Sequence, residues 1–376
     1  MKTKKRIFLF AFLAVMATAA FAQTPPRYFD TAAAPSAIVR LAIGYPSEGT
    51  LKDIVALKKQ GFLPAEKFEI VGIYHAKERT KYKEAQKLVL DRKIDWVHFH
   101  EIAAEIGPAD LYKANAASKE FADIIRKSDG LILFGGPDIP PAAYGEKTEL
   151  LTVIMDPYRH YMELSLVFHL LGGSQDGAFK GLLEDRPDFP VLGICLGEQT
   201  LNAGTGGTLV QDIWADIYGR KFFEDVIAMG RPNWHTNPWR DLHPEMEDLL
   251  RYMLHPIQFR PGSKFVAEMG FKSADQPYIM SAHHQSVGKI GKDFKVAATS
   301  LDGKVVEAIE HVKYPNVLGV QFHPEFSILW ETEPKYKFTP ADKDLFAVNE
   351  YLRSHSPSLE FHKKLWKWFF SIVGKK

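Results

Sequence analysis

Short apolar runs alternate with amphipathic stretches along most of this chain, and the alternation predicts a parallel sheet covered by helices. Predominantly apolar runs are expected as strands at residues 38–43, 68–74, 96–98, 131–134 and 189–194, and the last of these is apolar throughout, as in a buried parallel strand. Helical spacing is expected between them at residues 51–59, 81–91, 117–127, 157–171 and 198–203. Strands that alternate with helices imply right-handed crossovers and an α/β fold.

The pattern changes in the second half of the chain. Residues 222–262 are rich in aromatic, histidine and proline residues and predict an inserted loop region, either a lid or a cap on one sheet edge. Short β-rich segments predict an antiparallel patch that completes the sheet, at residues 278–280, 295–298, 305–310 and 317–321, and the last of these runs into the turn at residues 323–325. Two helices are expected at residues 342–354 and 357–373. The aromatic stripe of the second helix is expected to pack on its own domain, with a membrane-surface or dimer role as the alternative.

The first 22 residues have the layout of a secretory signal peptide. Basic residues precede an apolar run at residues 7–15, and Ala20-Phe21-Ala22 fits a cleavage site. A membrane anchor is the weaker alternative, because the apolar run is short for a span. We therefore expect a periplasmic or secreted protein without a stable membrane span in its mature form. Its main domain would cover residues 37–330, followed by a helical extension at 331–376.

Charge and cysteine content narrow the choice of function. A net charge of +1 argues against a nucleic-acid partner held through phosphate contacts. The chain has one cysteine, Cys195, whereas exported proteins that use cysteine structurally carry it in pairs. A lone thiol in an oxidising compartment therefore fits reactivity better than packing.

Cys195 lies in Gly193-Ile194-Cys195-Leu196-Gly197, between a predicted strand and a predicted helix. Flanking glycines permit the strained turn of a nucleophile elbow, which leaves the central side chain exposed. The helix N-terminus favours the thiolate. A core cysteine beside ordinary strand-end glycines is the alternative for this motif alone.

Two other strand ends offer the groups that a nucleophile needs. His323, in the His323-Pro324-Glu325 turn, can accept the thiol proton while Glu325 orients the imidazole. The loop after the strand at 131–134 brings Gly136, whose backbone N–H can bind an oxyanion together with the N–H of Leu196. Ligands of such sheets bind beyond the carboxyl ends of the strands, where all three segments end.

With these motifs the sequence resembles the class I glutamine amidotransferase-like superfamily. The motifs are GGPD at residues 135–138, GICLGEQ at 193–199 and GVQFHPE at 319–325. Within the superfamily it is most similar to the gamma-glutamyl-gamma-aminobutyrate hydrolase group, through DPYR with Glu163, GGTLVQDI at residues 206–213 and SAHHQ at 281–285. We expect a flavodoxin-like three-layer α/β sandwich with a mainly parallel central sheet, an inserted loop region and a C-terminal helical extension.

The resemblance implies a gamma-glutamyl amide hydrolase with Cys195, His323 and Glu325 as its catalytic groups, and no cofactor. It also implies that Gln199 and His283 lie on the substrate side. Leu196 and His160 depart from that group, which has arginine and aspartate at these positions, and this bears on the substrate. Arg159 and Glu163 lie four apart on a predicted helix. Spacing favours an ion pair within the helix, whereas the resemblance raises Arg159 as a substrate-binding residue.

A metal site and two other functions are weighed against this interpretation. His98, His100 and Glu101 could bind zinc, but they lack a fourth ligand at a recognisable spacing, so we expect no metal there. One alternative function is an ammonia-donating glutaminase subunit. The other is a non-catalytic binding protein that retains the pocket. A small-molecule gamma-glutamyl substrate is the expected partner, and the sequence leaves a homodimer open.

Overall fold

The computed structural model describes residues 26–33, 37–64, 67–80 and 82–375, so the signal-peptide prediction at residues 1–22 lies outside the described residues. A ten-stranded sheet forms the centre of the described part, in the order β3-β2-β1-β4-β5-β12-β11-β10-β7-β8. Its strands are β1 (Val39–Gly44), β2 (Phe68–His75), β3 (Val97–Ile102), β4 (Gly130–Leu133), β5 (Val191–Ile194), β7 (Met253–Phe259), β8 (Tyr278–Ser281), β10 (Phe294–Ser300), β11 (Val306–His311) and β12 (Val317–Val320). A separate pair joins β6 (Leu209–Val210) to β9 (Ser286–Val287).

Six neighbouring strands, from β3 across to β12, run parallel, and their apolar runs are buried on both faces. The next four strands, β11, β10, β7 and β8, each pair antiparallel with their neighbour. This arrangement confirms the mainly parallel sheet with an antiparallel patch. It differs at β12, which was expected within the patch but joins the two halves, since it pairs antiparallel with β11 and parallel with β5. One strand was missed: β7 lies inside the predicted insertion, at residues that we expected to form a loop or cap.

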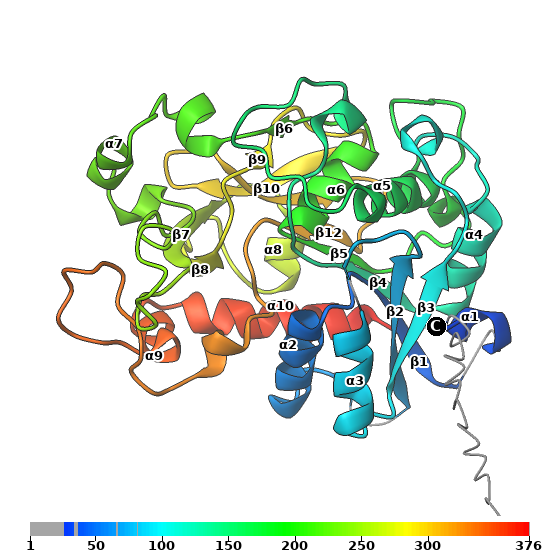
Figure 1. Ribbon diagram of the computed structural model, residues 1–376, viewed down its shortest axis with the longest axis horizontal. Coiled ribbons are helices and arrows are strands. Elements are labelled where there is room, and N and C mark those ends of the chain that lie inside the picture. The colour runs from blue at the N-terminus through cyan, green and yellow to red at the C-terminus, as the bar shows by residue number, and fades with distance from the viewer. Residues whose placement is uncertain (1–25, 34–36, 65–66, 81, 376) are drawn as a thin grey trace, which may run out of the picture.

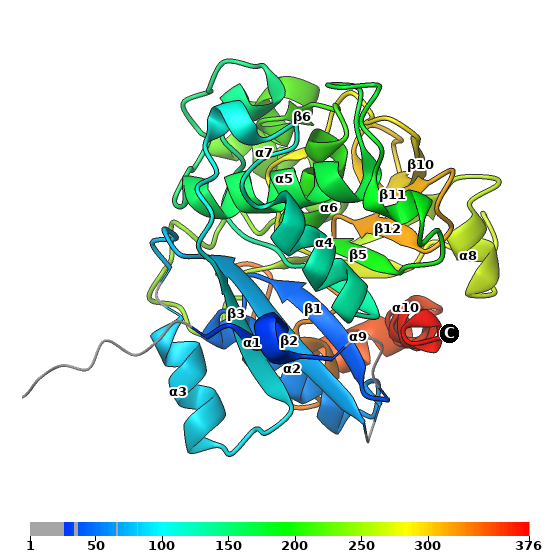
Figure 2. The ribbon, with the colours of Figure 1, turned by 90° about the vertical axis from the view of Figure 1, so that its right-hand side faces the viewer.

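Helices cover both faces of the sheet, which confirms the three layers (Figures 1 and 2). On one face lie α4 (Ser118–Lys127), α5 (Pro157–Leu171) and α6 (Leu196–Gly204), and on the other α2 (Glu48–Lys59), α3 (Lys83–Asp91) and α10 (Ser358–Ile372). Shorter helices are α1 (Tyr28–Thr31), α7 (Phe223–Ala228), α8 (Lys264–Glu268) and α9 (Val348–Ser354). Each face has its own apolar core, because the strands expose side chains to both sides.

The last helix, α10, belongs to this core. Its Leu365, Trp366 and Phe369 are fully buried in the same cluster as Leu41 of β1 and Ile132 of β4. The predicted aromatic stripe therefore packs on its own domain and supplies part of one helical layer. The other predicted C-terminal helix is shorter than expected, since α9 begins at Val348.

A third apolar cluster lies at the antiparallel end of the sheet. Residues of the insertion, including Trp234 and Leu250, pack there with Met280 of β8 and with Val348 and Leu352 of α9. The insertion is thus held by its own small core and does not lie loosely over the sheet. Among the described residues, no helix is both long enough and apolar enough to span a bilayer.

Candidate active site

Cys195 lies on a sharp turn between β5 and α6 with φ 52° and ψ −106°. This left-handed region is costly for a residue with a side chain and is found at functional sites. The flanking glycines allow the close packing that the turn requires. A Cβ added to Gly193 would lie 2.5 Å from the carbonyl carbon of Gly197, and one added to Gly197 would lie 2.1 Å from the carbonyl oxygen of Leu133. The local geometry is that of a nucleophile elbow.

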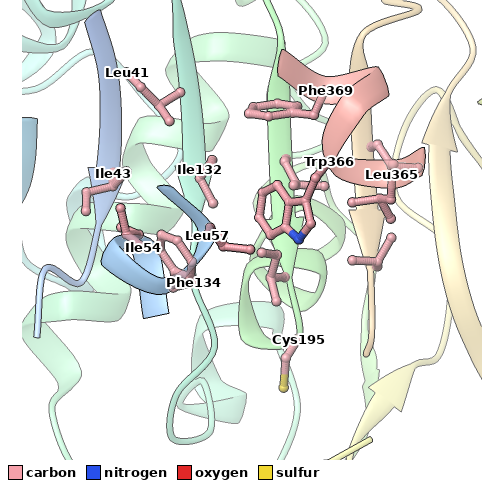
Figure 3. Close-up of a cluster of buried hydrophobic side chains, with 14 of the residues drawn as sticks. Leu41, Ile43, Ile54, Leu57, Ile132, Phe134, Cys195, Leu365, Trp366 and Phe369 are labelled. Carbon is pink, nitrogen blue, oxygen red and sulfur yellow. The ribbon is translucent and has the colours of Figure 1, made fainter. Parts of the chain in front are cut away.

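The thiol does not point into the apolar core. Figure 3 shows Cys195 at the edge of the buried cluster, with its sulfur directed away from the labelled apolar side chains. The residue is 6% exposed and belongs to the buried cluster, at its edge. The direction of its sulfur is what distinguishes it from an ordinary core cysteine.

His323 reaches the elbow because β12 pairs with β5. In the parallel register Val320 lies opposite Ile194, and the Cys195 N–H donates to the Val320 carbonyl over 2.8 Å. The chain then turns, and the His323 Nδ1–H donates to Glu325 Oε1 over 2.7 Å. Phe326 stacks on the imidazole at 4.2 Å between ring centroids. The ring is thereby fixed in one orientation with its other nitrogen free to act on the thiol.

Cys195 and His323 are in direct reach of one another. Gly135 packs against both: an added Cβ there would lie 2.7 Å from His323 Cε1 and 3.4 Å from the Cys195 Cβ. Burial alone would lower the pKa of His323, but the Glu325 carboxylate and the Cys195 sulfur outweigh it and raise the pKa to about 10. An imidazolium beside a sulfur is the arrangement that stabilises a thiolate.

The loop after β4 carries Gly136, and hydrogen bonds from the Arg159 side chain hold this loop in place. The guanidinium donates to the carbonyl oxygens of Phe134, over 2.6 Å, and Gly135, over 3.2 Å. It also donates from Nε to Glu163 Oε1 over 3.0 Å. A Cβ on Gly136 would lie 2.0 Å from Nη1, so only glycine fits over this contact.

This placement corrects the prediction that Arg159 binds substrate. The side chain is fully buried, its donors are bound to protein groups, and its guanidinium lies 3.8 Å from the Tyr45 ring centroid. The helical ion pair that spacing favoured is present, and Arg159 fixes the shape of the glycine loop. Leu196, the other predicted oxyanion donor, is the first residue of α6, where a backbone N–H has no acceptor within the helix.

Gln199 and His283 also lie away from open space. The Gln199 side chain is buried and donates to Gln321 Oε1 over 3.1 Å. The His283 ring is bound through Nδ1 to the Gln285 carbonyl, and its Nε2 faces Glu307 at 3.6 Å. These contacts turn both side chains into the protein, so the structure does not bring them to Cys195 as substrate contacts. His100 Nε2 lies 2.9 Å from Glu120 Oε1, whereas His98 Nε2 lies 3.6 Å from Glu69 Oε1 and makes no hydrogen bond to the described residues.

One cluster beside the glycine loop was missed. His284 is bound to Asp138, which ends the GGPD motif, over 3.1 Å and to Asp212 over 3.4 Å. Burial opposes a charge on this ring, but the two carboxylates raise the pKa of His284 to about 9. With the imidazole protonated and both acids ionised, the cluster keeps one negative charge. The sequence motifs could have indicated this cluster, because GGPD, GGTLVQDI and SAHHQ each contain one of its three residues.

His284 and Asp212 line a cavity of about 730 Å³ between the insertion and the segment at residues 148–153. Its wall also carries Leu150, Leu151 and Phe222, which are exposed apolar side chains. The cavity therefore combines an apolar wall with charged side chains of both signs, among them Asp212, Asp241, Arg220 and Arg240. Such a combination suits a small amphipathic ligand.

Comparison with known proteins identifies the family. The model of the family described as Peptidase C26 matches residues 69–325, a span that includes the elbow, the glycine loop and the His323-Pro324-Glu325 turn. The chain belongs to the peptidase C26 family. Membership confirms the resemblance to class I glutamine amidotransferase-like proteins and makes a cysteine-type C–N hydrolase or amidotransferase the coarse assignment.

Several relatives carry related names. A Mycobacterium tuberculosis protein named provisionally as a glutamine amidotransferase is 33% identical over 232 residues, which are 61% of this chain and 62% of the relative. A glutamine amidotransferase-like protein of Lactococcus lactis is 30% identical over 62% of this chain and 81% of its own length. The gamma-glutamyl-gamma-aminobutyrate hydrolase of Escherichia coli K12 is 26% identical over 58% of this chain and 73% of its own length. The match thus spans less than two thirds of the mycobacterial relative.

Proposed function

We propose that this peptidase C26 protein is a cysteine hydrolase that cleaves gamma-glutamyl amide bonds through a gamma-glutamyl thioester. The observation that carries the proposal is the meeting of Cys195, on its strained turn, with the His323–Glu325 pair. The name of the E. coli relative supports the gamma-glutamyl part of the proposal. The amine that leaves is not specified by these residues.

In the first half-reaction His323 holds the proton of the Cys195 thiol, and the thiolate attacks the side-chain carbonyl of the gamma-glutamyl group. Negative charge then develops on the carbonyl oxygen. The backbone N–H groups of Gly136 and Leu196 would bind that oxygen, and losing one such donor typically costs about 100- to 1,000-fold in rate. His323 gives its proton to the leaving amine as the C–N bond breaks, which leaves the thioester.

In the second half-reaction His323 accepts a proton from water, and the hydroxide attacks the thioester carbonyl. The C–S bond breaks, glutamate leaves, and the thiolate–imidazolium pair returns. Glu325 supports both halves because its carboxylate stabilises the imidazolium form. Positioned acid–base catalysis of this kind contributes about 100- to 10,000-fold.

The negative charge of the Asp138–His284–Asp212 cluster supports a substrate with an ammonium group. A free gamma-glutamyl residue carries an α-ammonium, and a carboxylate cluster at hydrogen-bond distance can bind it. Asp138 lies two residues beyond Gly136, so the cluster is adjacent to the proposed oxyanion site. We propose that this cluster binds the substrate ammonium in place of the predicted Arg159 and His283 contacts.

The test is turnover of a gamma-glutamyl anilide and of gamma-glutamyl-gamma-aminobutyrate by the purified protein. We expect Cys195→Ala and His323→Ala to lose turnover, while His98→Ala, a partly exposed histidine on β3, keeps it. Rapid quenching followed by mass spectrometry should find a glutamyl adduct on Cys195. If the protein with a verified reduced thiol turns over neither substrate nor glutamine, the hydrolase proposal is wrong.

A glutaminase is the second candidate, favoured by the amidotransferase names of the M. tuberculosis and L. lactis relatives. Both chemistries share the thioester, so they differ in the leaving group. Release of ammonia from glutamine at a kcat/KM well above that for any gamma-glutamyl amine would favour the glutaminase. A protein that binds gamma-glutamyl compounds but forms no adduct would instead be a binding protein.

A further inference from the structure

Four ionisable side chains from separate segments converge at the antiparallel end of the sheet. They are His235 in the insertion, His255 on β7, His283 after β8 and Glu307 on β11. One ligand atom of each lies within 4.8 Å of those of the other three, and all four residues are buried. Figure 1 shows these elements at the opposite end of the sheet from β3.

The backbone orients two of the rings so that one nitrogen of each faces Glu307. His255 Nδ1 is bound to the Pro256 carbonyl oxygen at 3.2 Å, and His283 Nδ1 to the Gln285 carbonyl oxygen at 2.8 Å. A carbonyl oxygen only accepts, so each Nδ1 carries the proton and each Nε2 presents a lone pair. This outer hydrogen bond to a carbonyl is the usual arrangement for histidines that bind metals.

Those lone pairs point at a carboxylate. Glu307 Oε1 lies 3.7 Å from His255 Nε2, and Oε2 lies 3.6 Å from His283 Nε2. The Nε2 atoms of all three histidines and Glu307 Oε2 are buried without a hydrogen-bond partner among the described residues. Two lone pairs and an anion facing one another in the interior repel unless a cation or an extra proton lies between them.

The third histidine is held in a strained conformation. His235 has φ 55°, in the left-handed region, and its Nδ1 lies 3.1 Å from Glu307 Oε1. The Ser281 hydroxyl and the His283 N–H both donate to its carbonyl oxygen. Strain that the surroundings maintain is a mark of functional positions.

We propose that His235, His255, His283 and Glu307 form a closed binding site for one divalent transition-metal ion, with Zn²⁺ as the preferred ion. Zinc takes four ligands in a tetrahedron at about 2.0–2.2 Å, which places the ligand atoms about 3.3–3.5 Å apart. The distances from Glu307 to the rings, 3.1, 3.6 and 3.7 Å, lie close to that spacing. Three imidazoles and one carboxylate also match the borderline character of zinc.

The ion would be structural, because four protein ligands complete a tetrahedron and the buried site leaves no open position. It would join the insertion to β7, β8 and β11. The site also lies near the catalytic elbow. Glu198, on the first turn of α6, is fully buried, and burial together with Glu307 and Cys195 raises its pKa well above the usual range.

The test is metal content and metal affinity of the whole protein. After purification and dialysis, plasma mass spectrometry should find about one zinc per chain. Replacement by Co²⁺ should give the strong visible absorption of a tetrahedral site. Glu307→Gln and His255→Asn should weaken Zn²⁺ affinity by more than about 100-fold, since each removes a direct ligand. His362→Asn is the matched control, because that ring is equally buried and lies on α10.

Two further measurements keep the proposal testable if a ligand variant does not fold. Stripping zinc from the wild-type protein with a chelator should lower its Tm, and Zn²⁺ but not Mg²⁺ should restore it. Cys195→Ala should keep its zinc, which excludes the thiol as a ligand. Wild-type protein that binds only substoichiometric metal after incubation with Zn²⁺, Co²⁺, Ni²⁺ or Mn²⁺ would overturn the proposal. Full metal content in Glu307→Gln would do the same.

Discussion

Replacing Arg159 with methionine separates its two candidate roles, holding the glycine loop and binding substrate. The guanidinium joins three groups in the interior: the Glu163 carboxylate and the carbonyl oxygens of Phe134 and Gly135. Methionine fills much of the same space but donates to none of them. The change therefore acts on both the stability of the fold and the shape of the loop that carries Gly136.

The expected loss of stability is about 3–5 kcal/mol, because breaking a buried pair leaves Glu163 without a partner. The activity effect follows from geometry. A shift of about 1 Å in a positioned group costs about 100-fold in rate, and one oxyanion donor contributes about 100- to 1,000-fold. We therefore expect kcat to fall by about 100-fold with little change in KM.

A second variant, Arg159→Met with Glu163→Leu, isolates the loop. Replacing a buried ion pair by apolar residues is often neutral, so most of the stability should return. The two loop carbonyls remain without their donors, which leaves a deficit of about 1–3 kcal/mol and keeps kcat low. Urea unfolding and steady-state kinetics on a gamma-glutamyl anilide measure the two effects. Arg126→Met, which removes an exposed ion pair to Asp123 on α4, is the control and should change stability by less than about 1 kcal/mol.

Two results would refute this reasoning. Wild-type kcat in the double variant would show that the loop keeps its shape without Arg159. A KM that rises at unchanged kcat in the single variant would instead indicate lost substrate binding, as the sequence resemblance implied. Rates must be normalised to the amount of folded protein, because a loss of folded protein alone also lowers the apparent kcat without changing KM.

Three further predictions follow from the surroundings of the catalytic turn. Glu325→Gln removes a carboxylate that helps to raise the pKa of His323 to about 10, so the variant should lose its imidazolium at lower pH. The alkaline limb of the kcat/KM profile should therefore move to lower pH, with a loss of about 100-fold or more in kcat. An alkaline limb that stays in place would contradict this prediction. Trp366→Phe removes the indole N–H that donates to the Pro324 carbonyl oxygen over 2.9 Å. The free energy of unfolding in urea should fall by about 1 kcal/mol, and kcat should fall more than KM changes. Burial and the nearby Glu325 carboxylate raise the pKa of Asp53 to about 6. The folded protein therefore binds that proton more tightly than the unfolded chain, and wild-type stability should fall by up to about 3 kcal/mol between about pH 4 and pH 6, a slope that Asp53→Asn should lack.

Much of the fold and the core of the site followed from local patterns. The central strands β4, β5 and β12 consist of apolar residues and glycine, because both of their faces are covered, and such runs are visible without knowing their neighbours. The strand-to-turn motifs at Cys195, His323 and Gly136 were visible for a similar reason. Each is a few residues long and sits where a strand ends, so the α/β topology already implied that they share one edge of the sheet.

Other features were set by contacts between distant segments. β7 was missed because its pattern is interrupted by His255 and Pro256, and it becomes a strand only by pairing with β8 and β10. Arg159 was assigned to substrate binding from the family resemblance, although its spacing to Glu163 favoured an ion pair within the helix. Only the packing of α5 beneath the loop shows that the guanidinium binds backbone carbonyls.

The sequence by itself determined the apolar runs, the helix periods and the short turns that carry the nucleophile and its base. Tertiary structure alone decided which buried polar groups meet. The four proposed metal ligands are an example, because His235 and Glu307 contact one another although they lie 72 residues apart in the chain. Local patterns record the burial of each residue but not its partner. Partners are set by strand order, and strand order depends on how all the segments pack together.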